Sequence, residues 1–342
     1  MSTAYFKACP EDFVVDEIPL YPAQGSGPHT FVRVEKRMRT TEEVAGDLAR
    51  AAGVSRREVG YAGRKDLVSI ARQWFSIPDL DPELASAFEI PGVRVLEAIR
   101  HQNKLRTGHL QANRFAIWVR GLTPELIVTA QDQIDALVAH GFANRFGAQR
   151  FGRAGENAKR GLEILLGAAR PRDRRRSRFF ISALQAQVFN RVLDTRPLSL
   201  DRFEVGDIAV KHESGGLFCV EDVAVDNERA RNFEISATGP IFGKKVARPL
   251  GVPAEREKQI LEECGVPDHE NLSPPRGVSL RGARRSLRAR ATDFEHRVEG
   301  DAMKLEFTLP SGSYATVLLE QLYGPLRDGL PENLGSGPGE SA

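Results

Sequence analysis

The chain has few cysteines and no long apolar run. Among its 342 residues, Cys9, Cys219 and Cys264 are the only cysteines, and they lie far apart. Three scattered cysteines fit neither a disulfide framework nor a zinc site, so we interpret them as small buried hydrophobic residues or idle thiols. No stretch approaches the roughly 18 apolar residues of a transmembrane helix, and the N-terminal MSTAYFKACPED does not resemble a secretory signal. We therefore expect a reduced, cytoplasmic location.

The sequence also lacks the common motifs of cofactor and metal enzymes. It has no glycine-rich phosphate cradle followed by Lys-Ser/Thr, no histidine pair at metal-ligand spacing and no Gly-x-Ser-x-Gly elbow. The seven histidines are spread singly along the chain. These absences argue against a nucleotide cofactor, a metal centre and a serine hydrolase, and we expect no cofactor and no metal.

The charge is nearly balanced overall but unevenly distributed. Hydrophobic residues make up 41% and charged residues 27% of a chain whose net charge is +2, which is typical of a globular protein of about two domains. The run RPRDRRRSR (170–178) holds six arginines, and RGARRSLRAR (281–290) holds five. Clustered arginine indicates a phosphate-binding surface, although a solvated face is the alternative. The candidate RNA contacts in these runs are Arg174, Arg175, Arg176, Arg284 and Arg285.

Periodicity and capping signals predict both strands and helices. Alternating apolar residues predict strands over 11–20, 29–37, 93–100 and 113–121, with 29–37 as the partner of 11–20. Helices are predicted over 40–53, with Thr41 as its cap, and over 123–141, 157–169, 175–196, 254–265 and 309–324. A hairpin is predicted over 284–309. Sheet-like segments thus flank a distinct middle, which predicts one mixed sheet interrupted by an inserted domain at about 170–288.

The strongest catalytic candidate is the carboxylate in YAGRKD (61–66). Asp66 follows two cations, Arg64 and Lys65, in a loop between extended segments. Neighbouring cations favour the ionised form of a carboxylate, and an ionised aspartate at a strand end can act as a nucleophile. On composition alone, a turn with a surface ion pair explains the motif equally well.

Several aromatic residues are candidates for binding a nucleobase. Asn144 and Phe146 lie in the glycine-rich loop NRFGAQRFG, where phenylalanine can stack on an unpaired base and asparagine can pair with a base edge. Phe13 and Tyr314 lie near predicted strand ends. A place in the hydrophobic core is the alternative for each of the three rings.

These segments together resemble the TruD family of tRNA pseudouridine synthases. They occur in the family's order over nearly the whole chain, and their combination is highly specific. The matching stretches are PEDFVVDE (10–17), GYAGRKDLVSIARQWFSI (60–77), KLRTGHLQANRF (104–115), NRFGAQRFG (144–152), SALQAQVFN (182–190) and LPSGSYAT (309–316).

The resemblance implies an α+β fold in two parts and a monomer. A pseudouridine-synthase catalytic domain with a mixed β-sheet would comprise 1–169 plus 289–325, and an inserted α/β TRUD domain would comprise 170–288. Residues 326–342, rich in Gly, Pro and Ser, would be a disordered tail. The implied partner is tRNA.

The resemblance also implies roles for individual residues. Asp66 corresponds to the family's catalytic aspartate, and Phe13, Asn144, Phe146 and Tyr314 would bind the substrate. The family often has Phe where Tyr314 stands, and stacking should survive that change. Lys65 is the expected charge partner of Asp66. Lys7 and Glu11, close to Phe13 in sequence, are further candidates for the pocket.

The implied reaction converts a uridine of tRNA, expected at position 13 in the D-arm, to pseudouridine without a cofactor. The uridine would be flipped out of the folded tRNA before Asp66 acts. Two rival interpretations remain: a tRNA-binding chaperone on the same scaffold that has lost catalysis, and a glycosidase acting on nucleic acid. A glycosidase generally needs two facing carboxylates, and the sequence offers Asp66 no persuasive partner.

Overall fold

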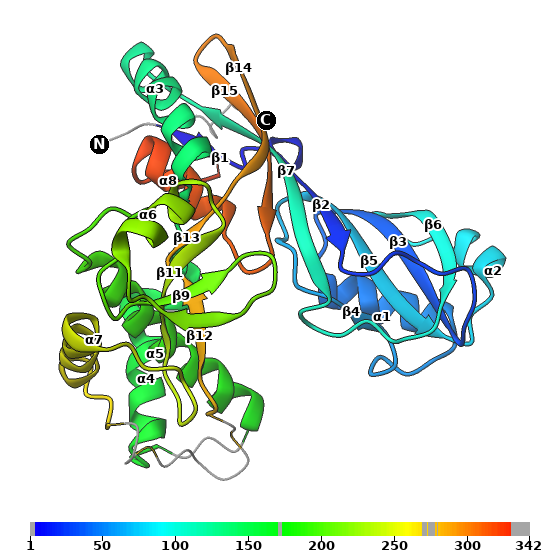
Figure 1. The fold of residues 1–342 in the computed structure, drawn as a ribbon. Helices are drawn as coiled ribbons and strands as arrows, with labels where there is room; N and C mark the ends of the chain where they lie inside the picture. The colour runs from blue at the N-terminus through cyan, green and yellow to red at the C-terminus, as the bar shows by residue number, and fades with distance from the viewer. Residues whose placement is uncertain (1–3, 170–172, 269–271, 273–277, 279, 330–342) are drawn as a thin grey trace, which may run out of the picture. The chain divides into compact units, whose positions relative to one another are not determined.

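The computed structural model describes residues 4–169, 173–268, 272, 278 and 280–329. Contacts divide the chain into two compact units, which are drawn together in Figure 1. Unit 1 comprises Met1–Asp135, Ala291–Ala315 and Leu319–Ala342, and unit 2 comprises Ala136–Arg290 and Thr316–Leu318. None of the helices in the described ranges is both long and apolar enough to cross a membrane.

Unit 1 is built on a mixed sheet of ten strands. The strand order is β14-β15-β7-β2-β5-β3-β6, with β4 beside β5, β1 beside β7, and β16 beside β1. The strands are β1 (Tyr5–Phe6), β2 (Phe13–Pro19), β3 (His29–Arg37), β4 (Gly60–Tyr61), β5 (Ile70–Pro78), β6 (Val93–His101), β7 (Leu110–Arg120), β14 (Thr292–Glu299), β15 (Ala302–Pro310) and β16 (Arg327–Asp328).

The expected pairing of the first two long strands is wrong. β5 lies between β2 and β3: it is parallel to β2, where Ile70 is opposite Val14, and antiparallel to β3, where Ile70 is opposite Arg37. A parallel neighbour requires a crossover connection, and here β3 and α1 (Thr41–Ala51) lie within that crossover. The parallel register brings the starts of β2 and β5 to the same edge of the sheet, and the candidate catalytic residues lie at that edge.

Helix α1 packs on the sheet and closes the core of this part of unit 1. Its apolar side chains Val44 and Leu48 are fully buried against strands β3 and β5, and Figure 1 shows the helix lying beside β5. The cap is Thr40, whose hydroxyl accepts from the Glu43 amide in a capping box. The expected cap, Thr41, is instead buried, and its hydroxyl donates to the Gln73 side chain at 3.0 Å.

Unit 2 combines a four-stranded sheet with packed helices. The sheet has the order β10-β9-β11-β12, and β8 and β13 form a separate pair. The strands are β8 (Phe142–Ala143), β9 (Ile208–Lys211), β10 (Leu217–Cys219), β11 (Ile235–Ile241), β12 (Ala283–Ser286) and β13 (Arg288–Ala289). The helices are α4 (Glu156–Leu165), α5 (Arg174–Asp194), α6 (Val223–Arg231) and α7 (Gly251–Glu263). α5 is the central helix, because Leu184 and Val188 belong to one apolar core and Phe189 and Leu193 to another.

Three boundaries differ from expectation. The hairpin consists of β14 and β15 alone, because residues 283–286 pair with β11 in unit 2. Residues 136–169 belong to unit 2, since α4 packs on α5. Arg327 and Asp328, assigned to the disordered tail, form β16 beside β1, whereas 330–342 lie outside the described residues. The division into a catalytic domain and an inserted domain stays a prediction.

The remaining helices join or flank these elements. In the described part of the chain they are α2 (Pro82–Ser86), α3 (Pro124–His140), α8 (Ala315–Tyr323) and the short 3-10 turns at Pro10–Asp12, Ala148–Arg150 and Arg153–Gly155. Thr123 caps α3 as expected, its hydroxyl accepting from the Leu126 amide at 3.3 Å. The predicted helix over 123–141 and the predicted pairing of β14 with β15 are thus confirmed, whereas α2, α6 and the neighbour of β2 were not predicted.

Candidate active site

The loop that carries Asp66 is held by hydrogen bonds to its backbone. The Gln73 side chain donates to the Gly63 carbonyl at 2.6 Å, and the Lys65 amide donates to the Thr41 hydroxyl at 2.9 Å. The Asp66 carbonyl accepts from Lys36 Nζ at 2.8 Å and from Ser69 Oγ at 2.7 Å. Anchors on α1, β3 and β5 therefore fix the loop, and the Asp66 side chain remains 41% exposed. A reachable carboxylate on a fixed backbone suits catalysis.

The charge partner of Asp66 is Lys7. Lys7 Nζ lies 2.8 Å from Asp66 Oδ2, and its side chain is only 3% exposed. The ammonium also lies over the rings of Phe13 (4.5 Å to the centroid) and Phe6 (5.1 Å). Lys7 has a left-handed backbone with φ +57°, a conformation that costs about 1–3 kcal/mol in a residue other than glycine. Such strain is typical of functional sites. Here the ion pair with Asp66 and the contacts with the two rings stabilise the strained conformation of Lys7.

Lys65, the expected partner of Asp66, has other contacts. Its Nζ lies 3.1 Å from Glu17 Oε2 and donates to the Asn113 side-chain carbonyl. Glu17 and Asn113 face each other in register across β2 and β7. Burial raises the pKa of Glu17, and the Lys65 charge opposes that shift. The expectation for Lys65 is therefore corrected. Its ammonium pairs with Glu17 and Asn113 and not with the Asp66 carboxylate.

Lys36 places a third ammonium at the site. It is fully buried and donates to the carbonyls of Arg39 (2.6 Å) and Asp66 (2.8 Å). Burial lowers the pKa of Lys36 from 10.5 to about 8, although the Asp66 charge opposes the shift. Three ammonium groups thus lie beside the carboxylates of Asp66 and Glu17, and Lys7 Nζ is also 4.0 Å from the exposed carboxylate of Asp328. Such a charged, buried cluster is costly for stability and is characteristic of a functional site.

The Lys36 pKa predicts a pH dependence of stability. Between about pH 8 and pH 10.5 the unfolded chain retains a proton that the folded chain has released, so this group makes the free energy of unfolding rise with pH in that window. Urea unfolding at pH 7.5 and 10 measures the effect. Both tryptophans, Trp74 and Trp118, lie in unit 1, so their fluorescence reports that unit.

We expect the wild type to gain stability relative to Lys36→Met as the pH rises through that window. Arg50→Met, at an exposed position on α1 in the same unit, controls for the loss of one positive charge. Parallel curves for the wild type and Lys36→Met would contradict the assignment.

Two aromatic candidates belong to unit 1, and Phe13 lies at this cluster. Phe13 is 4% exposed, and its ring packs edge-on to Phe115 with the centroids 6.0 Å apart. It therefore contacts Asp66 indirectly, through Lys7. Tyr314 is half-buried and ends the loop after β15. That loop starts next to β7, since the Ser311 amide donates to the Gln111 carbonyl at 3.0 Å. Base stacking by Phe13 and Tyr314 stays a prediction.

The two candidates from NRFGAQRFG belong to unit 2. The Asn144 side chain is largely used within the unit: Nδ2 donates to the Ser286 carbonyl at 3.0 Å, and Oδ1 accepts from Arg285. Phe146 is half-buried, edge-on to Phe189 at 5.5 Å, and the Arg285 guanidinium lies 4.3 Å from its centroid. Asn144 thus orients the loop, while a role in substrate binding stays a prediction for both residues.

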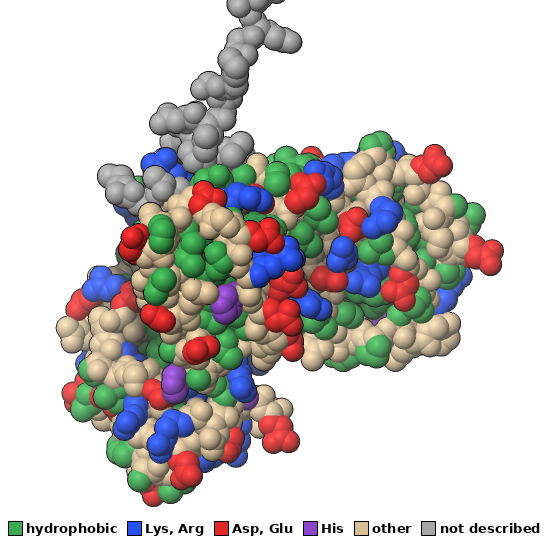
Figure 2. Space-filling model, turned by 90° about the horizontal axis from the view of Figure 1, so that it is seen from above, with side chains coloured by type: hydrophobic (Ala, Val, Ile, Leu, Met, Phe, Trp, Pro, Cys, Tyr) green, Lys and Arg blue, Asp and Glu red, His purple; other side chains and the backbone are tan. Residues whose placement is uncertain are grey.

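The two arginine runs have different environments. Arg174, Arg175 and Arg176 form the exposed first turn of α5. Arg284, in contrast, has a side chain only 1% exposed and paired with Glu257 at 2.8 Å. The expectation that Arg284 contacts RNA is corrected, because a buried ion pair is not available to a phosphate. Figure 2 shows basic and acidic side chains interspersed on the face that it displays. A phosphate-binding surface on this face would therefore be a small patch and not the whole face.

Three other residues of the site were missed or misplaced by the sequence reasoning. Asn113 lies within KLRTGHLQANRF without a distinguishing signal of its own, and no motif marks Lys36. Glu11, a further candidate, pairs with Arg37 instead of joining the Asp66 cluster. No spacing rule connects Lys7, Lys36 and Asp66, because they come from three separate segments that only the sheet brings together.

Comparisons with known proteins agree with these motifs. The family model "tRNA pseudouridine synthase D (TruD)" matches residues 3–170 and 165–322. A protein of Anaeromyxobacter dehalogenans named tRNA pseudouridine synthase D is 43% identical over 328 residues, covering 92% of both chains. A protein of the same name from Geobacter sulfurreducens is 36% identical over 381 residues, covering 93% of both.

A solved structure supports the fold. The putative tRNA pseudouridine synthase D from Methanosarcina mazei superposes with a TM-score of 0.76 at 22% identity, covering 95% of this chain and 94% of that one. At this identity the likeness concerns the fold alone. The family model and the relatives cover nearly the whole chain, and this chain is therefore a member of the tRNA pseudouridine synthase D family.

Proposed function

We propose that this protein isomerises a uridine of tRNA to pseudouridine, with Asp66 as the catalytic group. One observation carries the proposal: the exposed Asp66 carboxylate is paired with a buried lysine on a loop fixed by its own backbone hydrogen bonds. Family membership supports the same reaction, because the relatives are named tRNA pseudouridine synthase D. The family resemblance further suggests position 13, in the D-arm, as the target.

The reaction needs no net oxidation. The bond between ribose C1′ and uracil N1 breaks, the uracil rotates, and a bond forms between C1′ and C5. The proton on C5 leaves and N1 gains one, so substrate and product have the same composition. A group that stabilises the changing charge at C1′ and fixes the sugar is therefore the main requirement.

Asp66 can meet this requirement in two ways. Its carboxylate can attack C1′ and form a covalent ester with the sugar, or it can take a proton from the ribose on the way to a glycal. Lys7 stabilises the charged carboxylate in both cases and limits its rotation. The buried Lys36 adds positive potential, which favours the approach of a phosphate-bearing substrate.

The target uridine must leave the folded tRNA before it can reach Asp66. Flipping a nucleotide costs a few kcal/mol, and contacts elsewhere on the RNA must offset this cost. The exposed arginines at the start of α5 are suited to this role. Cations at a helix N-terminus are unfavourable for the helix itself, by about 0.3–1 kcal/mol each, so their presence favours an anionic partner.

Tritium release tests the proposed activity. The protein, without added cofactor, is incubated with tRNA labelled at uracil C5, and we expect tritium to appear in water while the RNA keeps its uracil. Release of free uracil would indicate a glycosidase. Binding of tRNA without tritium release would support a catalytically silent RNA-binding protein. Substituting U13 in the tRNA separates position 13 from other targets, since release should then disappear.

We expect the arginines of α5 to contribute to RNA affinity through phosphates. Replacing Arg174, Arg175 and Arg176 with glutamine should weaken tRNA binding and reduce the slope of log K against log salt by about 2–3. Fluorescence anisotropy from 50 to 200 mM salt measures both quantities. Arg94→Gln, Arg50→Gln and Arg297→Gln, three exposed arginines of unit 1, form a matched triple control. An unchanged slope in the α5 variant would show that these arginines form a solvent-exposed face and do not contact RNA phosphates.

A further inference from the structure

A pocket of about 470 Å³ lies in unit 1, outside the Asp66 cluster. It is formed by the segment between β2 and β3, the end of β6 and the segment between β6 and β7. Its volume is within the range of small-ligand sites. The residues that decide its chemistry are Tyr21, Gln24, Phe31, His101, Lys104 and Arg106.

The inner wall of this pocket is aromatic. Phe31 and His101 are each 3% exposed, and their ring centroids are 4.1 Å apart. Burial lowers the pKa of His101, so the imidazole is neutral at physiological pH. Its Nδ1 atom is buried and has no hydrogen-bond partner among the described residues. A neutral aromatic wall with an unsatisfied ring nitrogen favours a planar ligand with polar edges.

An exposed aromatic ring stands at the mouth. Tyr21 is 52% exposed, and His109 packs edge-on to it with the centroids 5.9 Å apart. This contact restricts the orientations of the tyrosine ring, so the ring loses less conformational entropy when a ligand binds. Exposed rings of this kind stack on unpaired bases, which contributes about 1–3 kcal/mol per base. The amide of Gln24 nearby can pair with a base edge.

The rim carries two cations, Lys104 and Arg106, and none of the described residues that line the pocket is acidic. Lys104 lies within electrostatic reach of Glu58, whose pKa is lowered first by hydrogen bonds from Ser55 and then by the Lys104 charge. Lys104 Nζ donates to a neutral group, the Arg57 carbonyl, at 2.6 Å. Arg106 is exposed and has no ion-pair partner in the described part of the chain. The rim therefore offers positive charge to an anionic ligand.

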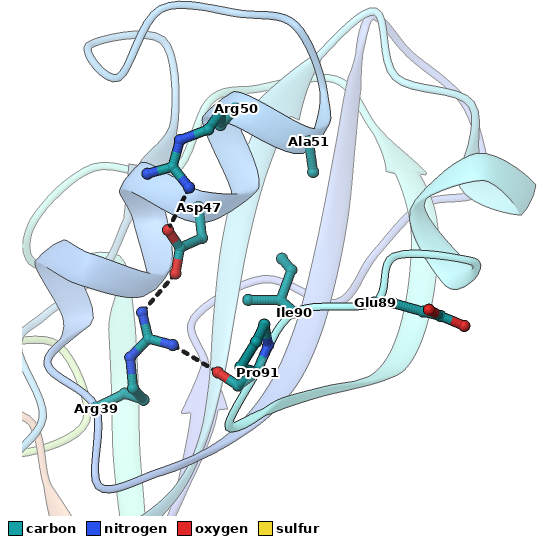
Figure 3. Close-up of a pocket in the computed structure, with 7 residues that line it drawn as sticks. All are labelled: Arg39, Asp47, Arg50, Ala51, Glu89, Ile90 and Pro91. Atoms are coloured by element: carbon teal, nitrogen blue, oxygen red, sulfur yellow. Dashed lines mark hydrogen bonds and ion pairs between the residues drawn. The ribbon is translucent and has the colours of Figure 1, made fainter.

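A second pocket of unit 1, of about 440 Å³, differs from the first because carboxylates neutralise its cations. Its arginines Arg39 and Arg50 both pair with Asp47, and Glu89 adds a further carboxylate. Figure 3 shows Asp47 between the two guanidinium groups. The positive charges there are used within the protein, whereas none of the residues that line the first pocket is acidic.

The first pocket is connected to the loop of Asp66. The Gly108 amide donates to the Ala62 carbonyl at 2.9 Å, four residues before Asp66. A Cβ on Gly60 would lie 2.3 Å from the Leu105 carbonyl oxygen, so the two segments pack backbone to backbone. Phe31 is opposite Ser76 on β5, six residues from the start of that strand at Ile70. That separation corresponds to about 20 Å, which one RNA substrate can span.

We propose that this pocket binds an unpaired nucleotide of the RNA substrate, away from the uridine that reacts. The base stacks on Tyr21 and enters towards Phe31 and His101, and the phosphate lies near Arg106 and Lys104. The inference rests on the proposed function for the identity of the RNA. Binding at this site adds affinity and selects RNAs with an unpaired nucleotide at the matching distance.

Two variants test the pocket through binding and kinetics. Tyr21→Ala should raise the Kd and the KM for tRNA about tenfold or more and leave kcat at saturating tRNA unchanged. Arg106→Gln should raise Kd and reduce the salt slope by about 1. Tyr21→Phe, which keeps the ring, should behave like the wild type. Ultraviolet crosslinking to the same tRNA should label the peptide that contains Tyr21, and the label should be lost in Tyr21→Ala.

Controls separate this proposal from the proposed function. Leu84→Ala removes an exposed apolar side chain of unit 1, and Arg50→Gln removes a cation of the compensated pocket; neither should change Kd. If the wild type isomerises tRNA and Tyr21→Ala has the same Kd and KM, the pocket proposal is overturned and the function stands. If the wild type does not isomerise tRNA, the function fails, whereas a raised Kd in Tyr21→Ala still supports an RNA-binding pocket.

Discussion

Replacing Asp66 with asparagine is expected to abolish isomerisation while leaving tRNA binding in place. Asparagine keeps the size of the side chain, but it can neither attack C1′ as an anion nor accept a proton from the ribose. We expect tritium release to fall at least about a thousandfold, because Asp66 is the carboxylate that Lys7 holds at 2.8 Å, whereas Asp328 lies 4.0 Å from the same ammonium. The loop should keep its conformation, since its anchors bind the backbone and not the Asp66 carboxylate.

The Asp66→Asn experiment needs a control for a lost carboxylate. Asp132→Asn serves, because Asp132 is exposed on α3. Tryptophan fluorescence and the Kd for tRNA establish that Asp66→Asn is folded and binds its substrate. Measurable turnover by the pure variant would show that the catalytic group lies elsewhere.

Replacing Lys7 with methionine should give the second largest loss of isomerisation activity. Methionine retains the apolar stem between Phe6 and Phe13 but removes the ammonium that holds Asp66 at 2.8 Å. A catalytic group displaced by about 1 Å can lose about a hundredfold in rate. We therefore expect kcat to fall about a hundredfold while KM changes little, since Lys7 is buried and positions Asp66 instead of binding RNA.

A conservative variant distinguishes positioning from a general loss of stability. Lys7→Arg keeps the charge and should recover part of kcat, whereas Lys7→Met should not. Lys258→Met, at an exposed site on α7, controls for one lysine charge. If KM rose while kcat stayed at the wild-type value, Lys7 would be an RNA contact and its role as the partner of Asp66 would be wrong.

The buried arginines of unit 2 show why charge clusters in a sequence need a structure. RGARRSLRAR contributes β12 and β13, and its alternation places some side chains inside the unit. Arg288 is 1% exposed and donates to the carbonyls of His140, Ala230 and Ile235. Burial lowers the pKa of Arg288 to about 10. Sequence composition cannot separate such an internal arginine from an exposed one, because the difference depends on which strand lies beside it.

The sequence by itself determined the family, the class of fold and the leading catalytic candidate. Ordered motifs are local, and a motif such as GRKD names Asp66 without any knowledge of contacts. Helices were likewise predictable, since a cap such as Thr123 and the periodicity act within a few residues.

Only the tertiary structure decided which groups surround Asp66. The parallel pairing of β2 with β5 brings Lys7 to Asp66, the β3 register adds Lys36, and the pairing of β2 with β7 engages Lys65 through Glu17 and Asn113. The same pairing overturned the expected β2–β3 partnership. Strand order and register depend on contacts between residues far apart in the chain. For this reason the sequence predicts the adjacent Lys65 as the partner of Asp66, whereas the distant Lys7 forms the ion pair.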